Sequence, residues 1–362
     1  MALFPSIRTH STDSSVTTQT PSASRYKVRD SPLLGRHSVV LLAKNVYSKA
    51  RVAIKFHATR QQYEREKAAL RALSSTYVPA LEEPLEGPEL AAMGLPPALV
   101  MEAGRCTLTE WLRGPGGVGG AGRGPGRDLL ALKSALHQVL GALVHLHSRR
   151  LVHRDLKPAN IMWFDGAHRF KLVDLAEAVP VGEVAPPCCT PLYSPPEQLR
   201  AALEGQACAS AVTPAADMWA FGVVAFEVLS GSRFYGPSPS LQAVLEAVFG
   251  HSPLPCEGGE ASALAGVELA QARRLIAHLV VRPPAQRWSA ATCHRNALFA
   301  SGDDTDQRAR AWDARTQSEL RPGGVGAGAG PGRRGSQLQP SLAGGGAGPQ
   351  AAQASASPPE RG

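Results

Sequence analysis

The sequence lacks the features that mark a disulfide-stapled secreted protein or a protein that spans a membrane. Its six cysteines form no Cys-x-x-Cys pair, and a chain of 362 residues is too long to need disulfide staples. The most apolar stretch, residues 218–229, is interrupted by Glu227 and is too short to cross a bilayer. We therefore expect reduced thiols, no membrane insertion and an intracellular location, either cytoplasmic or nuclear.

Runs of basic residues are also lacking. The formal net charge is +8, of which +6 lies between residues 26 and 300, yet nowhere do three Lys or Arg residues stand together. Such a spread of positive charge is typical of a basic soluble surface rather than of a patch that binds nucleic acid or a membrane. We expect no nucleic-acid partner, and the sequence leaves the oligomeric state open.

Both ends of the chain are poor in residues that build a core. Residues 1–25 are rich in Ser and Thr, and residues 301–362 are rich in Gly, Ala and Pro. Such segments bury too little apolar surface to offset the entropy lost on ordering, so we predict two largely disordered tails. The lack of repeated arginines in the N-terminal tail argues against an organelle import signal. A further Gly-rich stretch, residues 114–127, predicts a flexible surface loop.

Between the tails, strands come before helices. Residues 39–42 and 52–56 are β-rich runs on either side of a turn-like segment at 44–48, which predicts an antiparallel hairpin. Residues 61–73 follow with the spacing of an amphipathic helix, which places Glu66 on the apolar face.

The later part of the chain reads as mainly helical. After a further apolar strand at 98–101, leucines and valines repeat at helical intervals from residue 132 to residue 146. Strands first and helices later is the order of an α+β fold. We predict two lobes with a cleft between them: a small β-rich lobe of about residues 26–104 and a larger, mainly helical lobe of about residues 105–300.

One short segment, residues 153–160, sets a carboxylate, an ammonium group and an amide at fixed intervals. Asp155 could accept the proton of a hydroxyl group, Lys157 could offset charge on a moving phosphoryl group, and Asn160 could hold a metal ion that bridges phosphate oxygens. A polar turn after a helix has no need of this combination. The segment favours phosphoryl transfer, and it resembles the catalytic loop of eukaryotic protein kinases at every signature position.

The same resemblance assigns roles to two earlier residues. Residues 52–55 read Val-Ala-Ile-Lys and resemble the kinase strand whose lysine grips the α- and β-phosphates of ATP, which implies that role for Lys55. Glu66, eleven residues further on, resembles the helix carboxylate that pairs with this lysine, with Glu64 as the alternative.

The resemblance also implies ATP and Mg²⁺. Asp174, which follows a predicted strand at 170–173, resembles the metal-binding aspartate of the family, so Asn160 and Asp174 would hold Mg²⁺ through oxygen atoms. Met101 would be the gatekeeper, and residues 102–104 the hinge. The positions that match the ATP-contacting residues of the family are Leu33, Gly35, Val40, Ala53, Lys55, Met101, Glu102, Gly104 and Met162.

Further matches concern the activation segment and the framework of the domain. Residues 189–197 resemble the substrate-docking end of an activation segment, and residues 217–222 resemble the central buried helix. The matching residues are Arg154, Thr190, Pro196, Glu197, Asp217 and Arg287, the last of which stands where a partner for Glu197 is expected. Together the motifs cover about residues 26–300 in the order of the family, which favours a bilobal protein-kinase-like fold.

Two segments depart from the family pattern. In the phosphate-covering loop only Gly35 stands at a glycine position, and Leu33 and Ser38 stand at the other two, so we expect this loop to hold ATP loosely. The metal-site triplet is Asp-Leu-Ala rather than Asp-Phe-Gly. Leu175 can still fill an apolar slot, whereas Ala176 restricts the backbone and could bias the loop toward one state.

The activation segment offers no acceptor for a regulatory phosphate. Residues 175–189 contain no Ser, Thr or Tyr, so activation by phosphorylation of this segment is not expected. We hypothesise that Glu183 supplies a permanent negative charge near Arg154, with an ordinary solvated glutamate as the alternative.

The resemblance implies a serine/threonine protein kinase, which transfers the γ-phosphoryl group of ATP to hydroxyl groups of a protein substrate. Lys157 and Thr190 match the serine/threonine rather than the tyrosine type. The alternative is a pseudokinase scaffold that binds nucleotide weakly and acts through protein partners, which the poor glycine loop and Ala176 favour. A small-molecule phosphotransferase of related fold would not need residues 196–197 or 217–222.

Overall fold

The structure is a computed structural model, and it describes most of the chain between residues 25 and 299. The described ranges are 25–28, 31–35, 38–92, 94–113, 129–188, 190–205, 211–250, 254 and 267–299. The predicted tails, apart from Arg25, and the predicted loop at 114–127 lie outside the described residues. Their boundaries stay predictions.

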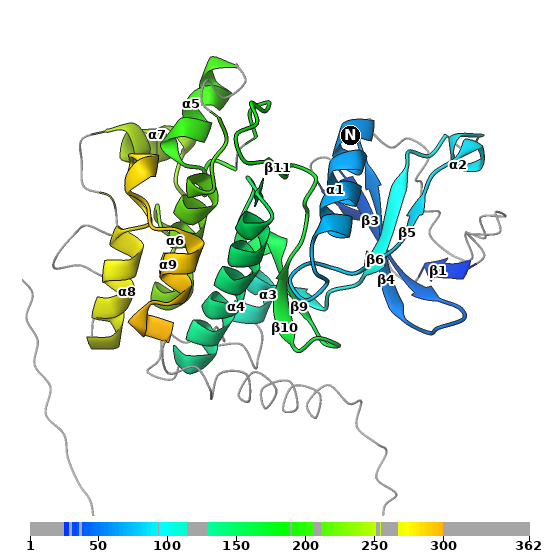
Figure 1. Cartoon of the computed structure of the whole chain (residues 1–362), viewed down its shortest axis with the longest axis horizontal. Helices are drawn as coiled ribbons and strands as arrows, with labels where there is room; N and C mark the ends of the chain where they lie inside the picture. The colour runs from blue at the N-terminus through cyan, green and yellow to red at the C-terminus, as the bar shows by residue number, and fades with distance from the viewer. Residues whose placement is uncertain are drawn as a thin grey trace, which may run out of the picture. The chain divides into compact units, whose positions relative to one another are not determined.

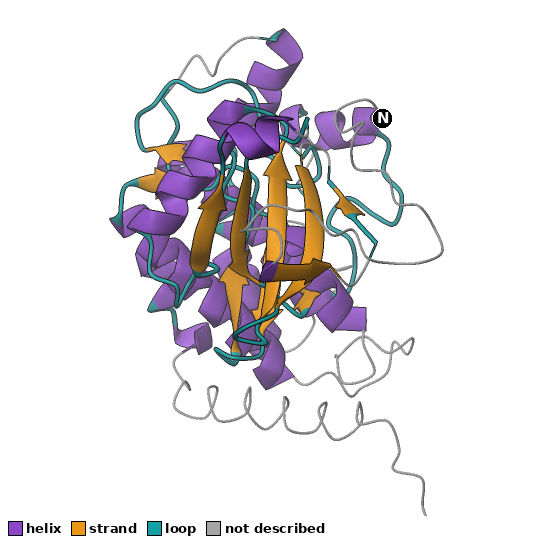
Figure 2. Cartoon of the chain, turned by 90° about the vertical axis from the view of Figure 1, so that its right-hand side faces the viewer, coloured by secondary structure: helices purple, strands orange, loops and turns teal. Residues whose placement is uncertain are grey.

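An antiparallel sheet forms the first part of the molecule. Its strands run in the order β1-β3-β4-β6-β5, and β2 pairs with β3 beside β1. Figure 2 views this sheet nearly face-on, with helices behind it. The bounds are β1 (Tyr26–Val28), β2 (Leu33–Leu34), β3 (Ser38–Asn45), β4 (Arg51–His57), β5 (Leu81–Leu85) and β6 (Ala98–Glu102).

The central hairpin of the sheet follows from its sequence. Strands β3 and β4 pair with Leu41 opposite Ile54, which confirms the predicted antiparallel hairpin. The Asn45 side chain closes the turn, because its Oδ1 atom accepts hydrogen bonds from the backbone of Tyr47 and Ser48. Alternate residues of both strands pack into a buried cluster on one face of the sheet.

Helix α1 (Arg60–Ala72) packs against the sheet and carries one buried charge. It begins at Thr59, whose side chain accepts a hydrogen bond from the backbone N–H of Gln62. Tyr63, Glu66 and Leu70 lie on its buried face, as the spacing predicts. A short helix, α2 (Pro88–Ala92), then connects β5 to β6.

The second part of the molecule is mainly helical, as Figure 1 shows. Its helices are α3 (Leu108–Arg113), α4 (Leu129–Ser148), α5 (Pro196–Glu204), α6 (Ala215–Ser230), α7 (Leu241–Phe249), α8 (Val267–Ala277) and α9 (Ala290–His294). Short 3-10 helices occupy Pro158–Asn160, Pro284–Gln286 and Ala297–Phe299. Two small sheets join β7 (Cys106–Thr107), β9 (Ile161–Phe164) and β10 (Arg169–Leu172), and β8 (Leu151–Val152) with β11 (Val179–Pro180).

Helix α6 lies at the centre of this helical part. Its residues are buried on nearly all sides, including Asp217 in the first turn. Gly222 allows the close approach of the chain after α8, because a Cβ atom at this position would lie 2.7 Å from the Val280 side chain and 2.8 Å from that of Leu279. The helix therefore forms a rigid base for the loops that pack on it.

Helix α4 is long and apolar enough, by length and composition alone, to cross a membrane. Its mean hydropathy reaches 1.4, and 61% of that window is buried inside the protein. It packs against β10, α6 and α9, so its apolar face has partners within the domain. Burial in the core accounts for the hydropathy of this helix.

Three cations that are far apart in the sequence form a row across the sheet. Lys27 pairs directly with Lys44, and Lys44 pairs directly with Arg51, so the three side chains emerge on one face. Among the described residues, none of the three forms an ion pair with a carboxylate. Strand register therefore gathers three cations that are far apart in the sequence into one row.

We predict that Lys44→Glu stabilises the domain at low salt. The substitution replaces two repulsive cross-strand pairs by two attractive ones, and such pairs contribute roughly 0.2–1 kcal/mol each. Thermal unfolding should show a melting temperature above that of the wild type, with a gain that shrinks as salt is added. Lys44→Gln, which only removes the repulsion, should give an intermediate gain. A lower melting temperature for Lys44→Glu at low salt would contradict this account.

Candidate active site

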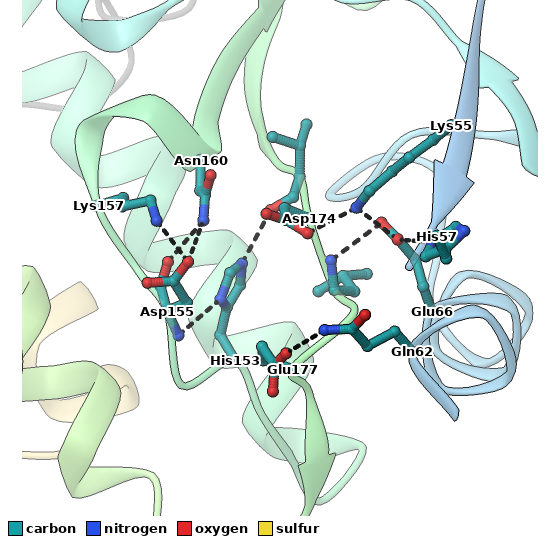
Figure 3. Close-up of polar contacts among 12 residues, drawn as sticks. Lys55, His57, Gln62, Glu66, His153, Asp155, Lys157, Asn160, Asp174 and Glu177 are labelled. Carbon is teal, nitrogen blue, oxygen red and sulfur yellow. Dashed lines mark hydrogen bonds and ion pairs between the residues drawn. The ribbon is translucent and has the colours of Figure 1, made fainter. Parts of the chain in front are cut away.

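A buried ion pair joins the sheet to α1, and a second carboxylate from the helical part completes it. Lys55 Nζ lies 2.6 Å from Glu66 Oε2 and 2.6 Å from Asp174 Oδ1, as Figure 3 shows. The expected pairing of Lys55 with Glu66 is therefore present. The alternative, Glu64, has a side chain that is 43% exposed and pairs with Arg60 and Lys67 on the surface of α1.

The three groups hold one another in their charged forms. Burial alone would lower the pKa of Lys55, but the charges of Asp174 and Glu66 outweigh it and raise that pKa above its usual value. Burial opposes ionisation of Asp174 in turn, and the Lys55 ammonium outweighs it and holds the pKa of Asp174 at about 2. The pKa of Glu66 is lowered for the same reason. At neutral pH the site holds one cation and two anions.

The catalytic-loop residues expected from the sequence surround Asp155. Lys157 Nζ donates to Asp155 Oδ2 at 2.6 Å, and Thr190 Oγ1 donates to Asp155 Oδ1 at 2.6 Å. Lys157 Nζ also lies 3.2 Å from Thr190 Oγ1. The Asn160 side-chain amide donates to the Asp155 backbone carbonyl at 2.8 Å and to Oδ2 at 3.1 Å. The loop and the end of the activation segment thus meet at one carboxylate.

Asp217 of α6 holds the catalytic loop in place. Its side chain accepts hydrogen bonds from the backbone N–H groups of His153 and Arg154, both at 2.9 Å, and lies 2.9 Å from His147 Nε2. Arg154 has a φ of 70°, a left-handed conformation that costs roughly 1–3 kcal/mol for a residue with a side chain. Hydrogen bonds to a charged group contribute about 1.5–3 kcal/mol, which is enough to offset this strain.

The oxygen atoms expected to bind Mg²⁺ are brought together by the backbone. Val173 N–H donates to the Asn160 carbonyl at 3.0 Å, which places Asp174 beside Asn160. Because the Asn160 amide nitrogen donates to Asp155, its oxygen is left as an acceptor. The Asp174 side chain is 39% exposed and accepts from Lys55 through only one of its two oxygens. This donor set, a carboxylate and an amide oxygen, fits a hard cation such as Mg²⁺.

Most residues expected to contact ATP lie in two neighbouring cross-strand rows. The first row is Leu33, Val40 and Lys55, and the second includes Ala53 and Met101. Residues two apart on a strand face the same side, so both rows share one face of the sheet.

The hinge packs directly on the helical part. A Cβ atom on Gly104 would lie 2.9 Å from the Cε atom of Met162, so only glycine fits there without displacing that side chain. The buried Lys171 of β10 donates through Nζ to Glu102 Oε2 at 2.6 Å. The backbone N–H of Arg105 donates to the Trp163 carbonyl at 2.8 Å. The expected hinge residues thus contact β9 and β10.

Comparison with known proteins agrees with this geometry. The family model for the protein kinase domain matches residues 34–299, well over half of the chain. The chain belongs to the protein kinase family. The two-part architecture, a β-rich N-terminal region followed by a helical C-terminal region, confirms the predicted bilobal α+β fold.

Individual relatives are protein kinases. The human calcium/calmodulin-dependent protein kinase type 1B is 29% identical over 310 residues, which cover 79% of this chain and 78% of that kinase. The mouse serine/threonine-protein kinase SBK1 is 42% identical over a shorter stretch of 103 residues, 28% of this chain and 24% of that protein. The likeness to the first relative extends over most of both chains.

The Asp-Leu-Ala triplet of this kinase domain, residues 174–176, fits its surroundings. Leu175 is fully buried with Tyr63, Leu70 and Met101, so the prediction that it fills an apolar slot is confirmed. Ala176 is buried and is not among the residues with positive φ, so alanine is not strained in this conformation. The left-handed residue of the triplet is Asp174 itself, with a φ of 63°.

The hypothesis that Glu183 supplies charge to Arg154 is wrong. The Arg154 guanidinium donates to the backbone carbonyls of Glu177 and Pro186. Glu183 instead lies 3.5 Å from Arg65 on α1. The two terminal nitrogens of the Arg154 guanidinium meet backbone carbonyls because residues 177–186 fold back over them, and this path could not be predicted from local sequence.

A further ion pair anchors the end of the activation segment. Arg287 donates to Glu197 through both terminal nitrogens, at 2.6 and 2.9 Å, as expected. Its guanidinium also donates to the carbonyls of Val281, Arg282 and Ala215. Pro196 and Glu197 begin α5 rather than ending a loop, because proline is favoured at the first position of a helix.

Three residues of the site were not anticipated from the sequence. His57 lies 2.5 Å from Glu66, Lys171 binds the hinge residue Glu102, and Gln62 donates to Glu177 at 2.9 Å. Only His57 carries a sequence signal, because it follows Lys55 by two residues on the same strand face. Lys171 and Gln62 depend on contacts between segments that the sequence pattern does not bring together.

We predict that Asp217→Asn destabilises the domain by roughly 2–3 kcal/mol at pH 7, because an amide cannot accept both backbone hydrogen bonds. Burial opposes ionisation of Asp217, but His147 and the loop N–H groups outweigh it and lower its pKa below the usual 3.8. The contribution of the ionised Asp217 to the free energy of unfolding is therefore complete above pH 4 and is lost as the pH falls through the lowered pKa. Denaturant unfolding should show a wild-type advantage that shrinks below pH 4, and a constant difference would contradict this.

We predict a small coupling between Arg65 and Glu183 and none between Arg154 and Glu183. The Glu183 side chain is 38% exposed, so its ion pair should contribute no more than about 1 kcal/mol. Double-mutant cycles with Arg65→Met, Arg154→Met and Glu183→Gln measure both couplings in unfolding experiments. A larger coupling with Arg154 than with Arg65 would overturn the assignment.

Proposed function

We propose that this chain is an active serine/threonine protein kinase that uses ATP and Mg²⁺. The observation that carries the proposal is the arrangement around Asp155, which accepts from Lys157 and Thr190 at 2.6 Å each. The site also holds the complete set of Lys55, Glu66 and Asp174, in which Lys55 bonds to both carboxylates. A domain that had lost phosphoryl transfer would have no need to keep both halves of the site together.

Asp155 is the acceptor for the proton of the substrate hydroxyl. Its Oδ1 atom already accepts from the hydroxyl group of Thr190, which supports a role in orienting a substrate hydroxyl. Lys157 stands beside the same carboxylate and can offset the negative charge of the group in transfer. This lysine and Thr190 also support the serine/threonine type.

Lys55 binds the α- and β-phosphates of ATP in the proposed reaction, and Glu66 holds its ammonium. Asn160 and Asp174 supply the oxygen ligands for Mg²⁺, which when bound neutralises charge on the phosphate oxygens. Orientation of reactants alone can contribute roughly 7–11 kcal/mol to such a reaction, so a site that only positions groups can account for most of the rate.

A nucleotide-binding scaffold is the competing function, and one observation favours it. Leu33 and Ser38 stand where the phosphate-covering loop of the family has glycine, and the Leu33 side chain is 55% exposed at the start of this loop. Backbone that approaches phosphate closely tolerates side chains badly. The scaffold would bind nucleotide weakly, act through protein partners and transfer no phosphate.

We predict that Asp155→Asn lowers turnover at least about 100-fold, because removal of a general base costs roughly 10²–10⁴ in rate. The purified full chain should label a generic basic protein with phosphate from radiolabelled ATP, on Ser and Thr and not on Tyr. Asp165→Asn is the matched control, since Asp165 is a partly exposed residue of the turn between β9 and β10 and pairs with Arg105. Equal label from the wild type and Asp155→Asn would favour the scaffold.

A further inference from the structure

The carboxylate of Glu66 has other hydrogen-bond partners besides Lys55. Its Oε2 atom accepts from Lys55 Nζ at 2.6 Å and lies 2.5 Å from His57 Nε2. Its Oε1 atom accepts from the backbone N–H of Leu175 at 3.2 Å. Figure 3 shows Lys55 and His57 reaching this carboxylate from one strand. His57 therefore shares in the placement of Glu66.

The local fold delivers His57 to this position. Lys55 and His57 are two residues apart near the end of β4, so both side chains emerge on the same face of the sheet. The His57 ring packs edge-on against Tyr63 of α1, with the ring centres 5.7 Å apart and the planes at 77°. The side chains of His57 and Glu66 are each only 1% exposed, so packing fixes the geometry of the contact.

The chemistry of His57 and Glu66 determines which of the two carries the hydrogen of the hydrogen bond between them. An ionised carboxylate can only accept hydrogen bonds, so His57 Nε2 must carry the hydrogen. Burial opposes ionisation of Glu66, and the attraction of Lys55 and the hydrogen bond from His57 outweigh it. His57 Nδ1 has no hydrogen-bond partner among the described residues, so the ring is held from the Glu66 side.

This contact matters because Lys55 is shared between two carboxylates. Its Nζ atom lies 2.6 Å from both Glu66 and Asp174, so Glu66 must hold the ammonium against a competing anion. The last torsion of a glutamate side chain is soft, and a second donor on Oε2 removes that freedom. We propose that His57 is a positioning residue, which fixes the Glu66 carboxylate so that Lys55 is held in place for the phosphates of ATP.

This role rests on the proposed function, and its test has readouts that do not require turnover. The first variant is His57→Leu, which introduces an apolar side chain of similar size that has no donor. The second is His57→Gln, which restores an N–H donor. Thermal unfolding of both variants checks that the domain is folded, and affinity for a fluorescent ATP analogue with Mg²⁺ is measured beside kcat and KM for ATP.

We expect His57→Leu to lower kcat/KM for ATP and the affinity for the analogue by roughly ten- to a hundredfold, the size of one hydrogen bond to a charged group. His57→Gln should stay within about threefold of the wild type in both measurements. The proposal is overturned if His57→Leu behaves as the wild type. It is also overturned if both variants are impaired equally, because the ring would then act only through packing.

A measurement on the unmodified chain tests the same contact without nucleotide. The ¹⁵N chemical shifts of the His57 imidazole, assigned by their loss in His57→Gln, should report a protonated Nε2 atom. A ring protonated only at Nδ1 could not donate to Glu66 and would sink the proposal. If the wild type transferred no phosphate, the proposed function would fail, while the imidazole shifts and the order of nucleotide affinities would still decide the role of His57.

Discussion

The buried ammonium of Lys55 is the point on which the two parts of the molecule depend. A charge with a side chain only 7% exposed is stable only where opposite charge compensates its desolvation, and here one carboxylate comes from α1 and the other from the loop after β10. Each carboxylate needs partners of its own. Glu66 bonds to His57 and to the backbone N–H of Leu175, and the second bond holds residues 174–176 against α1. The requirement to neutralise one cation therefore fixes a strand, a helix and a loop relative to one another.

The helical part supplies the second fixed point. Asp217 is completely buried in α6 and accepts hydrogen bonds from the backbone N–H groups of His153 and Arg154, which fixes the backbone directly before Asp155. The terminal nitrogens of Arg154 donate to two backbone carbonyls of the activation segment, and Gln62 and Arg65 of α1 contact the same segment. The order of this segment thus arises from hydrogen bonds and ion pairs already present in the unmodified chain, which agrees with its lack of hydroxyl side chains between residues 175 and 188.

Much of the architecture and of the site could be predicted because their signals are local. The β3–β4 hairpin is marked by a turn between two β-rich runs, and the spacing of Tyr63, Glu66 and Leu70 identifies the buried face of α1. Contacts that depend on tertiary packing could not be predicted in this way. The partner of Glu183 is set by how α1 meets the activation segment, and the row of Lys27, Lys44 and Arg51 is set by strand register. The charge of the domain was expected to be dispersed, and only pairing across strands reveals that these three cations lie in one row.

The anchoring of the hinge has a consequence for motion between the two lobes. At the start of the hinge, Glu102 is bonded to Lys171 and to the backbone of Ala80, and directly after the hinge the backbone N–H of Arg105 donates to the Trp163 carbonyl. Ala103 and Gly104 stand between these two anchored residues, and the Met162 side chain packs against Gly104. Among the described residues, the backbone of this connection that has no such anchor is therefore limited to the three peptide units between Glu102 and Arg105. The covalent connection between the two lobes is thus a short segment with few free backbone torsions rather than a flexible linker.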